Sequence, residues 1–197
     1  MEDSRESLAE RDGSARHRSP LPPEEVDRLV RLAKEGSREA FGRILEAFRL
    51  AIVSLAYQVT GSCEDAEDVA QETFLRAFRH IAEYREESKF FSWLYRIAVN
   101  AALDRVRRGR VIPTAVREDV SLWVDDEEDE VTRDQRVMIW MALDRLPPDQ
   151  RAALVLRELH GLSYVEIGRI LGITPGAVGW RIRAARQYLQ RALRGAV

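Results

Sequence analysis

Residues 160–193 read HGLSYVEIGRILGITPGAVGWRIRAARQYLQRAL, and this stretch carries the strongest local structural signal in the chain. Ser163, followed three residues later by Glu166, matches a capping box, which opens a helix. Gly172 is placed to end that helix after about two turns, and Thr174 then provides a second N-cap. Two helices separated by so tight a turn predict a helix-turn-helix, whose second helix enters the major groove of DNA.

The second predicted helix has an apolar side and a basic side. Its apolar positions recur at helical spacing and form the side that we expect to be buried: Val178, Ile182, Ala185 and Leu189. The opposite side and its flanks carry Gly176, Trp180, Arg181, Arg183, Arg186 and Gln187. Because Trp180 lies off the apolar stripe, we expect its ring to be partly exposed. Arginine binds both phosphates and guanine edges, so this side favours DNA binding over a plain helical hairpin with a solvated basic face.

Charge is distributed unevenly along the chain, although its net value is only −2. Residues 111–135 hold nine acidic and two basic residues, whereas residues 136–197 hold four acidic and ten basic ones. Such a basic C-terminal block can attract a polyanion even when the whole chain is nearly neutral. The acidic strip before it is equally consistent with a plain solvated spacer.

Composition limits the classes of protein to which a chain of 197 residues can belong. Hydrophobic residues make up 45% and charged residues 32%, which is typical of a soluble folded protein. No apolar run approaches the roughly 20 residues that span a membrane, and the polar N-terminus is not a signal peptide. Cys63 is the only cysteine, so no internal disulfide can form, and we expect a cytoplasmic location without membrane insertion.

Metal, cofactor and catalytic chemistry receive little support from the sequence. His17, His80 and His160 are scattered without partners at metal-ligand spacing, so each is expected at the surface or at a helix end. No nucleophile–base pairing, glycine-rich phosphate loop or metal-binding spacing is present in the sequence. We therefore expect no enzyme, no cofactor, no metal site and no small-molecule substrate.

Helical periodicity runs from residue 24 to near the end of the chain, with little sign of alternating strands. Residues 1–23 are polar, end in a proline-rich stretch and predict a disordered tail. We expect helices near residues 24–34, 38–59, 64–81, 90–108, 133–145, 148–159, 164–171 and 175–194. The predicted fold class is all-α, with two small helical domains joined by an acidic linker.

The predicted helix DAEDVAQETFLRAFRHI (65–81) has one apolar stripe and several acidic groups. We expect the buried stripe to consist of Ala66, Ala70, Phe74, Ala77, Phe78 and Ile81. Asp65, Asp68, Gln71 and Glu72 lie on other faces, near the positive end of the helix dipole. Carboxylates there stabilise the helix by themselves, and an acidic face could equally dock a basic partner.

The segment FFSWLYRIAVNAALDRVRR (90–108) places aromatic residues beside arginines. On a helix, a polar stripe at spacing four contains Ser92, Arg96, Asn100 and Asp104. An apolar stripe contains Phe90, Leu94, Ile97 and Ala101, so we expect most of the aromatic surface, with Trp93, to belong to the core. The polar loop AEYREESKF (82–90) precedes this helix and could accept an unstacked base.

Three segments together resemble one protein family: DAEDVAQETFLRAFR (65–79), FFSWLYRIAVNAALDRVRR (90–108) and LPPDQRAALVLRELHGLSYVEIGRILGITPGAVGWRIRAAR (146–186). In this order and at these separations they are similar to an extracytoplasmic-function (group 4, sigma-70 family) RNA polymerase sigma factor. The resemblance covers about residues 25–195. It implies a region 2-like domain at 24–110, an acidic linker at 111–133 and a region 4-like helix-turn-helix domain at 134–197.

The resemblance also implies a function and partners. Such a factor binds bacterial core RNA polymerase, at the clamp helices of the largest subunit and at the flap, and directs it to promoter DNA. Region 2 would recognise and help to melt the −10 element, and region 4 would read the −35 element. The acidic linker would thread toward the active-site cleft of the polymerase. An anti-sigma factor is a further partner that the resemblance makes plausible.

Three sets of site residues follow from the resemblance. The core-polymerase set contains Asp65, Asp68, Gln71 and Glu72. The −10 DNA set contains Tyr84, Arg85, Ser88, Lys89, Arg96, Asn100, Arg105, Arg107 and Arg108. The −35 DNA set contains Thr174, Gly176, Ala177, Trp180, Arg181, Arg183 and Arg186.

The sequence departs from the family pattern at Gly179 and Trp180, where members often carry a basic or polar pair. Glycine inside a helix costs about 1 kcal/mol relative to alanine, so this pair calls for an explanation. The main alternative function is a helix-turn-helix regulator that binds duplex operators, as a dimer, without acting as a polymerase subunit. A helical enzyme is a third, weaker alternative.

Overall fold

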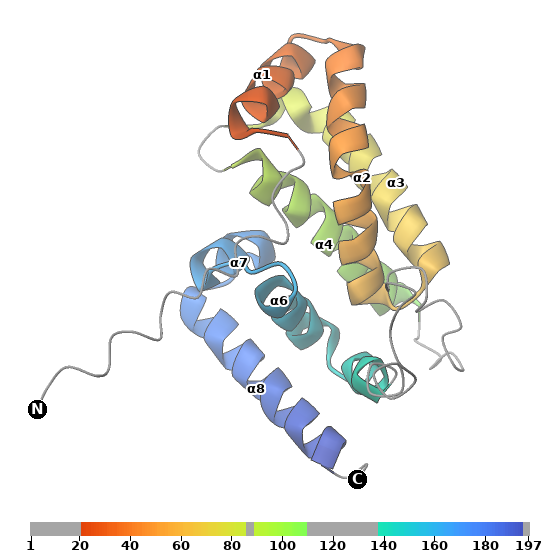
Figure 1. The fold of residues 1–197 in the computed structure, drawn as a ribbon, viewed down its shortest axis with the longest axis vertical. Helices are drawn as coiled ribbons and strands as arrows, with labels where there is room; N and C mark the ends of the chain where they lie inside the picture. The colour runs from red at the N-terminus through yellow and green to blue at the C-terminus, as the bar shows by residue number, and fades with distance from the viewer. Residues whose placement is uncertain (1–20, 86–88, 110–137, 195–197) are drawn as a thin grey trace, which may run out of the picture.

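The computed structural model describes residues 21–85, 89–109 and 138–194, and within these ranges every regular element is a helix (Figure 1). The upstream group consists of α1 (Pro23–Lys34), α2 (Arg38–Thr60), α3 (Cys63–His80), the short 3₁₀ turn η1 (Ile81–Glu83) and α4 (Phe90–Arg108). The downstream group consists of helical residues 138–144, α6 (Pro148–Glu158), α7 (Tyr164–Leu171) and α8 (Pro175–Arg194). The expected tail and acidic linker lie outside the described residues, except for the last three residues of the tail.

Serine side chains cap the N-termini of several of these helices. The hydroxyl of Ser37 accepts a hydrogen bond from the backbone amide of Ala40 at 3.2 Å, and α2 follows. Ser62 caps α3 in the same way, accepting from the amide of Asp65 at 3.2 Å. These caps satisfy amide groups that have no partner inside the helix. The bounds of the fully described helices agree with the predicted ranges to within one residue.

Helix α2 is the centre of the upstream group, because α1, α3 and α4 all pack against it. Phe48, Ile52 and Leu55 are almost completely buried along its length. The ring of Phe48 meets the ring of Phe90 at the start of α4, with centroids 5.9 Å apart in an edge-on arrangement. Burying one such side chain contributes about 1.5–3 kcal/mol, so this helix supplies much of the apolar stabilisation of the bundle.

The downstream group packs its three labelled helices around a smaller set of apolar side chains. Leu156 of α6, Ile167 of α7 and Ile182 of α8 are each at most 1% exposed. Gly168 lets α7 approach the turn that leads into α8, because a Cβ atom there would lie 2.7 Å from the carbonyl oxygen of Ile173. The close contact fixes how α8 leaves the turn.

The two groups of helices lie directly against each other. Helix α4 packs on α6 and α7, α2 packs on α6, and the buried side chains form one continuous cluster (Figure 1). His160 lies in this contact and is only 5% exposed. Of the two positions expected for His160, the surface or a helix end, the structure shows the second, because the residue follows the end of α6. His160 is buried by the contact between the two groups of helices. Helical periodicity within one segment does not reveal such a contact.

A pair of glycine substitutions tests the packing of the downstream group. We expect Gly168→Ala to lower the free energy of unfolding by about 1–3 kcal/mol, because the backbone of Ile173 must move. Gly42→Ala is the matched control on α2, where an added Cβ meets no described heavy atom within 4 Å outside its own helix backbone. It should raise the free energy of unfolding by about 0.5–1 kcal/mol. Urea denaturation followed by far-UV circular dichroism measures both, and changes of the same sign would contradict this account.

Candidate nucleic-acid interface

Helices α7 and α8 form the helix-turn-helix that the sequence predicts. The amide of Ser163 donates to the carboxylate of Glu166 at 2.9 Å, and the amide of Glu166 donates to the Ser163 hydroxyl at 3.3 Å. Gly172 ends α7 with a φ of 67°, a conformation that suits glycine. Thr174 then caps α8 by accepting a hydrogen bond from the amide of Ala177 at 3.2 Å. The predicted capping box, turn and second cap are all confirmed.

The predicted stripe of α8 faces inward, and its basic side faces solvent. Val178, Ile182 and Ala185 are buried, while Leu189 is partly buried. The ring of Trp180 is 62% exposed, as expected for a position off the stripe. The members of the −35 set are exposed at Thr174, Gly176, Trp180, Arg183 and Arg186 and half-buried at Ala177 and Arg181.

Two arginines of the −35 set are already in ion pairs within the protein. The guanidinium of Arg186 donates from Nε to a carboxylate oxygen of Glu158 at 3.1 Å, and this hydrogen bond raises the pKa of Arg186 above its ordinary value. A nitrogen of Arg181 lies 3.8 Å from a carboxylate oxygen of Asp149. A DNA phosphate would have to replace these carboxylates to bind the same nitrogens.

Gly179 has a packing explanation in the structure. A Cβ atom at this position would lie 3.3 Å from the ring of Tyr164, the first residue of α7. That ring also lies under the guanidinium of Arg157, whose central carbon is 5.4 Å from the ring centroid. Because Gly179 has no side chain, the ring of Tyr164 on α7 packs directly against α8. This contact offsets part of the free energy that glycine costs inside a helix.

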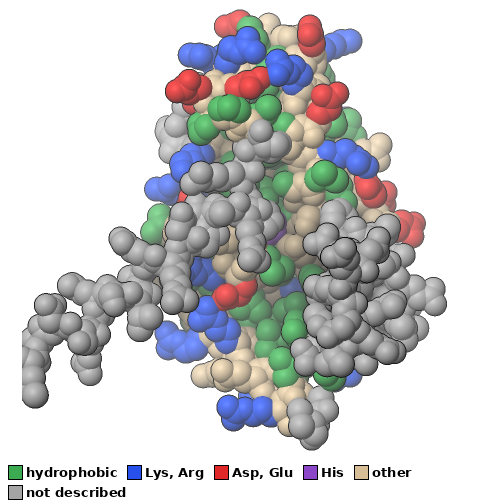
Figure 2. Space-filling model, viewed as in Figure 1, with side chains coloured by type: hydrophobic (Ala, Val, Ile, Leu, Met, Phe, Trp, Pro, Cys, Tyr) green, Lys and Arg blue, Asp and Glu red, His purple; other side chains and the backbone are tan. Residues whose placement is uncertain are grey.

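Charged side chains are distributed differently over the two groups of helices. In the space-filling view most visible Asp and Glu side chains lie over its helices, whereas the visible charged side chains of the downstream group are mainly Lys and Arg (Figure 2). The basic side chains of the downstream group agree with the basic block at residues 136–197, whereas the acidic strip at residues 111–135 lies outside the described residues.

Two of the four residues in the core-polymerase set share an arginine from the −10 set. The Nε atom of Arg105 lies 2.6 Å from the carboxylate of Asp65, and its Nη2 atom lies 2.8 Å from the carboxylate of Asp68. The hydrogen bond with Asp65 is the main reason why the pKa of Arg105 lies above its ordinary value. Glu72 pairs with Arg76 one turn later on α3. The carboxylates therefore lie on one accessible face, but they are not free charges.

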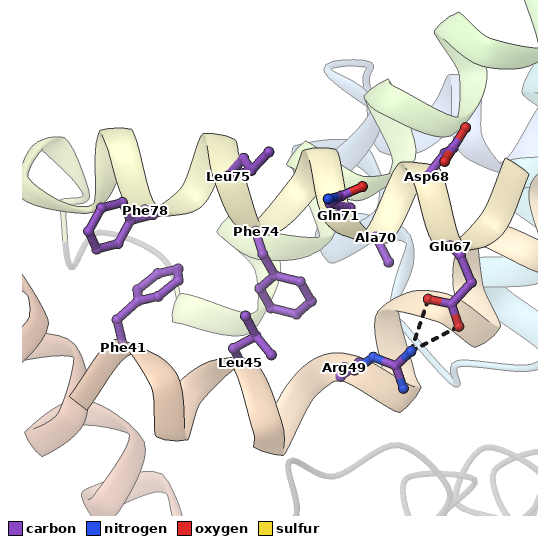
Figure 3. Close-up of a pocket in the computed structure, with 10 residues that line it drawn as sticks. All are labelled: Phe41, Leu45, Arg49, Glu67, Asp68, Ala70, Gln71, Phe74, Leu75 and Phe78. Atoms are coloured by element: carbon purple, nitrogen blue, oxygen red, sulfur yellow. Dashed lines mark hydrogen bonds and ion pairs between the residues drawn. The ribbon is translucent and has the colours of Figure 1, made fainter. Parts of the chain in front are cut away.

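A groove between α2 and α3, with a volume of about 470 Å³, adjoins this face (Figure 3). Apolar side chains line most of it, and Arg49 pairs with Glu67 at one end with nitrogen–oxygen distances of 3.0 Å. Asp68 and Gln71 of the core-polymerase set belong to its lining. The full lining consists of Phe41, Leu45, Arg49, Glu67, Asp68, Ala70, Gln71, Phe74, Leu75 and Phe78.

Phe78 corrects one expectation from the sequence. It was expected in the buried stripe of α3, and the other five members of that stripe are buried, but Phe78 is 47% exposed. Its ring meets Phe41 of α2 edge-on, with centroids 5.1 Å apart, at one end of the groove. Leu75, which is 51% exposed, is a groove residue that the sequence analysis missed. Its signal in the sequence is an apolar residue outside the stripe, with polar Gln71, Glu72 and Arg79 one helical turn away.

The −10 set is spread over α4 and the segment before it. Tyr84 is 6% exposed and packs its ring against Phe90 and Trp93. It therefore belongs to the core under the exposed residues of the −10 set. Ser88 lies outside the described residues. Arg105 is half-buried beside the acidic face of α3, and the exposed members are Arg85, Lys89, Arg96, Asn100, Arg107 and Arg108.

The aromatic segment behaves largely as predicted, with one exception. Phe90 is buried and Trp93 is half-buried, so these rings mainly hold α4 in place. Ser92 was expected on the polar stripe with Arg96 and Asn100, but it is 8% exposed. The exposed polar surface of α4 therefore begins one turn later than the sequence pattern indicates.

The described residues contain no group of three His, Cys, Asp or Glu side chains arranged to hold a metal ion. Across residues 21–85, 89–109 and 138–194, none of the helices combines the length and the apolar character that crossing a bilayer requires.

Fold and site together define a helical protein that carries a helix-turn-helix behind an upstream helical bundle. Comparison with family models assigns each part. The model for Sigma-70 region 2 matches residues 44–111, and the model for Sigma-70 region 4 matches residues 136–194.

Individual relatives agree with these matches. The chain is 33% identical over 185 residues to the RNA polymerase sigma-H factor of Pseudomonas aeruginosa, covering 88% of this chain and 96% of that protein. It is 32% identical over 181 residues to the ECF RNA polymerase sigma factor SigW of Bacillus subtilis, covering 86% and 97%. The chain belongs to the extracytoplasmic-function (ECF) group of the sigma-70 family.

Two solved structures resemble the fold over most of its length. CnrH, solved in complex with the cytosolic domain of CnrY, is 26% identical with a TM-score of 0.67, and the match covers 88% of this chain and 99% of that one. The sigma factor RpoE of Bartonella quintana, solved with the anti-sigma factor NepR, is 26% identical with a TM-score of 0.62. That match covers 78% of this chain and 96% of the other.

Proposed function

We propose that this protein is an alternative sigma factor that binds bacterial core RNA polymerase, recognises −35 and −10 promoter elements and helps to melt the −10 region. The observation that carries the proposal is the presence of region 2 and region 4 matches in one chain, the second over the helix-turn-helix. A regulator that only binds duplex operators would not need a region 2 domain. This role requires no bond to be made or broken, so the protein needs no catalytic residue, and its place of action is the cytoplasm.

The groove and the acidic face of α3 are the proposed docking surface for the clamp helices of the largest polymerase subunit. Leu75 and Phe78 leave apolar surface in water that a partner can cover. Asp68 and Gln71 add polar groups at the same groove. An amphipathic helix with a basic side fits such a surface, because it can fill the apolar groove and pair with the carboxylates. The flap is the proposed partner of region 4.

The exposed strip of α4 is the proposed −10 surface. Opening a duplex costs stacking and pairing energy, so an extruded base must be compensated by stacking and hydrogen bonds to its edges. Asn100 is exposed and can serve a base edge, while Arg107 and Arg108 at the end of α4 can hold phosphates. The rings beneath them are buried or half-buried and keep this strip rigid.

The outer side of α8 is the proposed −35 surface. Arg183 can pair with a phosphate or a guanine edge in the major groove. The exposed ring of Trp180 gives apolar contact that suits a thymine methyl group. Regulation by an anti-sigma factor is part of the proposal, since the related RpoE chain was solved with one.

The proposal as a whole is tested by transcription in vitro. Core polymerase plus this protein should initiate at defined start sites on genomic templates, and alignment of those sites should yield −35 and −10 elements. Core polymerase alone is the control. If no promoter-specific transcription started and the protein failed to bind core polymerase, the proposed function would be refuted.

Substitution at the groove tests the polymerase surface. Leu75→Arg places a positive charge in the groove and should weaken binding to core polymerase about tenfold or more, measured by fluorescence anisotropy. Leu50→Arg is the matched control, because Leu50 is 66% exposed on α2 and does not line the groove. Equal loss of affinity in both variants would mean that the groove is not the docking surface.

Two arginines of α8 separate the −35 surface from the rest of the helix. Arg183→Ala should weaken binding of holoenzyme to promoter DNA about tenfold. If the contact is to a phosphate, the affinity should also depend less on salt: the magnitude of the slope of log affinity against log salt concentration should decrease by about 1. Arg191→Ala, at the far end of α8, should change affinity less than twofold. A result in which Arg191 matters more than Arg183 would contradict the proposed orientation of α8.

A further inference from the structure

One large side chain projects from the first turns of α8 into solvent. Between Gly176 and Ile182, Trp180 is the only exposed residue that has a side chain, and its ring is 62% exposed. Val178 and Ile182 face the core. Recognition helices of this motif contact base edges with their N-terminal residues. The group that α8 offers to a base at this position is therefore an indole.

The nearby arginines are directed toward other partners. Arg181, the next residue after Trp180, is half-buried and lies 3.8 Å from a carboxylate oxygen of Asp149. The Nε atom of Arg186 donates to Glu158 at 3.1 Å. Because these guanidinium groups already face carboxylates, Trp180 has no competing cation beside it in the first two turns of the helix.

The surface beside Trp180 is open to an approaching base pair. Gly176 lies one turn before Trp180 on the same side of α8, and a Cβ atom there would meet, among the described residues, only the hydroxyl of Thr174 at 4.0 Å. Gly179 is different, because the ring of Tyr164 on α7 fills the space beside it. A base can thus approach the backbone at Gly176, while the contact with Tyr164 holds α8 in place.

An indole matches one base better than the other three. It has an apolar ring and a single donor, Nε1–H, but no hydrogen-bond acceptor. In the major groove thymine displays a C5-methyl group beside the acceptor O4, whereas adenine and cytosine display amino donors and guanine has no methyl group. An indole that covered an amino group would leave that donor unsatisfied, which costs free energy. Only thymine offers both an apolar group and an acceptor without a donor.

We propose that Trp180 is a specificity-determining residue of the −35 surface and selects thymine, by contact with the C5-methyl group and by a hydrogen bond from Nε1–H to O4. The inference rests on the proposed function and deepens it from a surface to a particular base. On this account the departure from the family pattern at Gly179 and Trp180 changes which −35 element is read and does not abolish the reading.

Removal of single methyl groups from the promoter tests the contact. Each thymine of the mapped −35 element is replaced in turn by deoxyuridine, which lacks only the C5-methyl group. At one position this change should weaken binding of the holoenzyme about fivefold, because one buried methyl group is lost. Holoenzyme with Trp180→Ala should bind both DNAs equally at that position. Arg183→Ala is the matched control: it should bind more weakly overall but keep the difference between the two DNAs.

Replacement of the same thymine by 5-methylcytosine tests the hydrogen bond. This base keeps the methyl group but presents an amino donor in place of O4. The wild-type holoenzyme should bind it about tenfold more weakly than thymine. Trp180→Phe keeps an apolar ring without a donor, so it should keep the deoxyuridine effect and lose most of the difference between thymine and 5-methylcytosine. Because Trp180 is exposed, circular dichroism should show an unchanged fold in these variants.

Three results would overturn the inference: no methyl-sensitive thymine in the −35 element, equal methyl sensitivity in Trp180→Ala, or equal binding of thymine and 5-methylcytosine by the wild type. Failure to bind core polymerase would instead refute the proposed function. In that case selection of random duplexes by the full-length protein alone tests the base preference. Loss of a preferred thymine in Trp180→Ala would support the inference, and identical selected sites would overturn it.

Discussion

Helix α4 has to satisfy two sets of neighbours at once, and the arrangement of the molecule depends on this constraint. It packs on α2 and α3 within its own bundle and on α6 and α7 of the downstream group. Leu94, Tyr95 and Ala98 are completely buried as a result. Close-packed interiors tolerate little change in volume, so packing occupies most of the positions along the helix. Only a narrow polar strip, which includes Arg96 and Asn100, remains available to a ligand.

Local features of the fold were predictable because they depend on residues close together in the sequence. Ser163 satisfies the amide three positions later, as its capping box predicts, and Ser37 and Ser62 cap their helices at the same spacing. The stripe on α8 and the exposure of Trp180 follow from helical spacing in the same way. These features together define the helix-turn-helix.

The features that the sequence did not reveal concern surfaces that only the three-dimensional arrangement determines. Phe78 continues the apolar stripe of α3, but at that end of the groove α2 covers its ring only in part. His160 and Ser92 are polar residues that become buried, His160 because the two groups of helices meet around it. Periodicity describes one helix at a time, so it cannot show where a neighbouring helix ends or where a second domain docks. The pairing of Arg105 with Asp65 was hidden for the same reason, since 40 residues separate them.

The position of Arg105 between Asp65 and Asp68 would link the two proposed binding events through a single guanidinium. A basic ligand that takes these carboxylates releases the arginine, and an anion that takes the arginine releases the carboxylates. Thermodynamic linkage makes such an effect reciprocal, so each ligand changes the affinity of the other by the same factor. Because these ion pairs are partly exposed, that factor is modest and decreases as salt concentration rises. Under the proposed function, the acidic and basic surfaces of the upstream group would behave as one cooperative unit whose coupling depends on ionic strength.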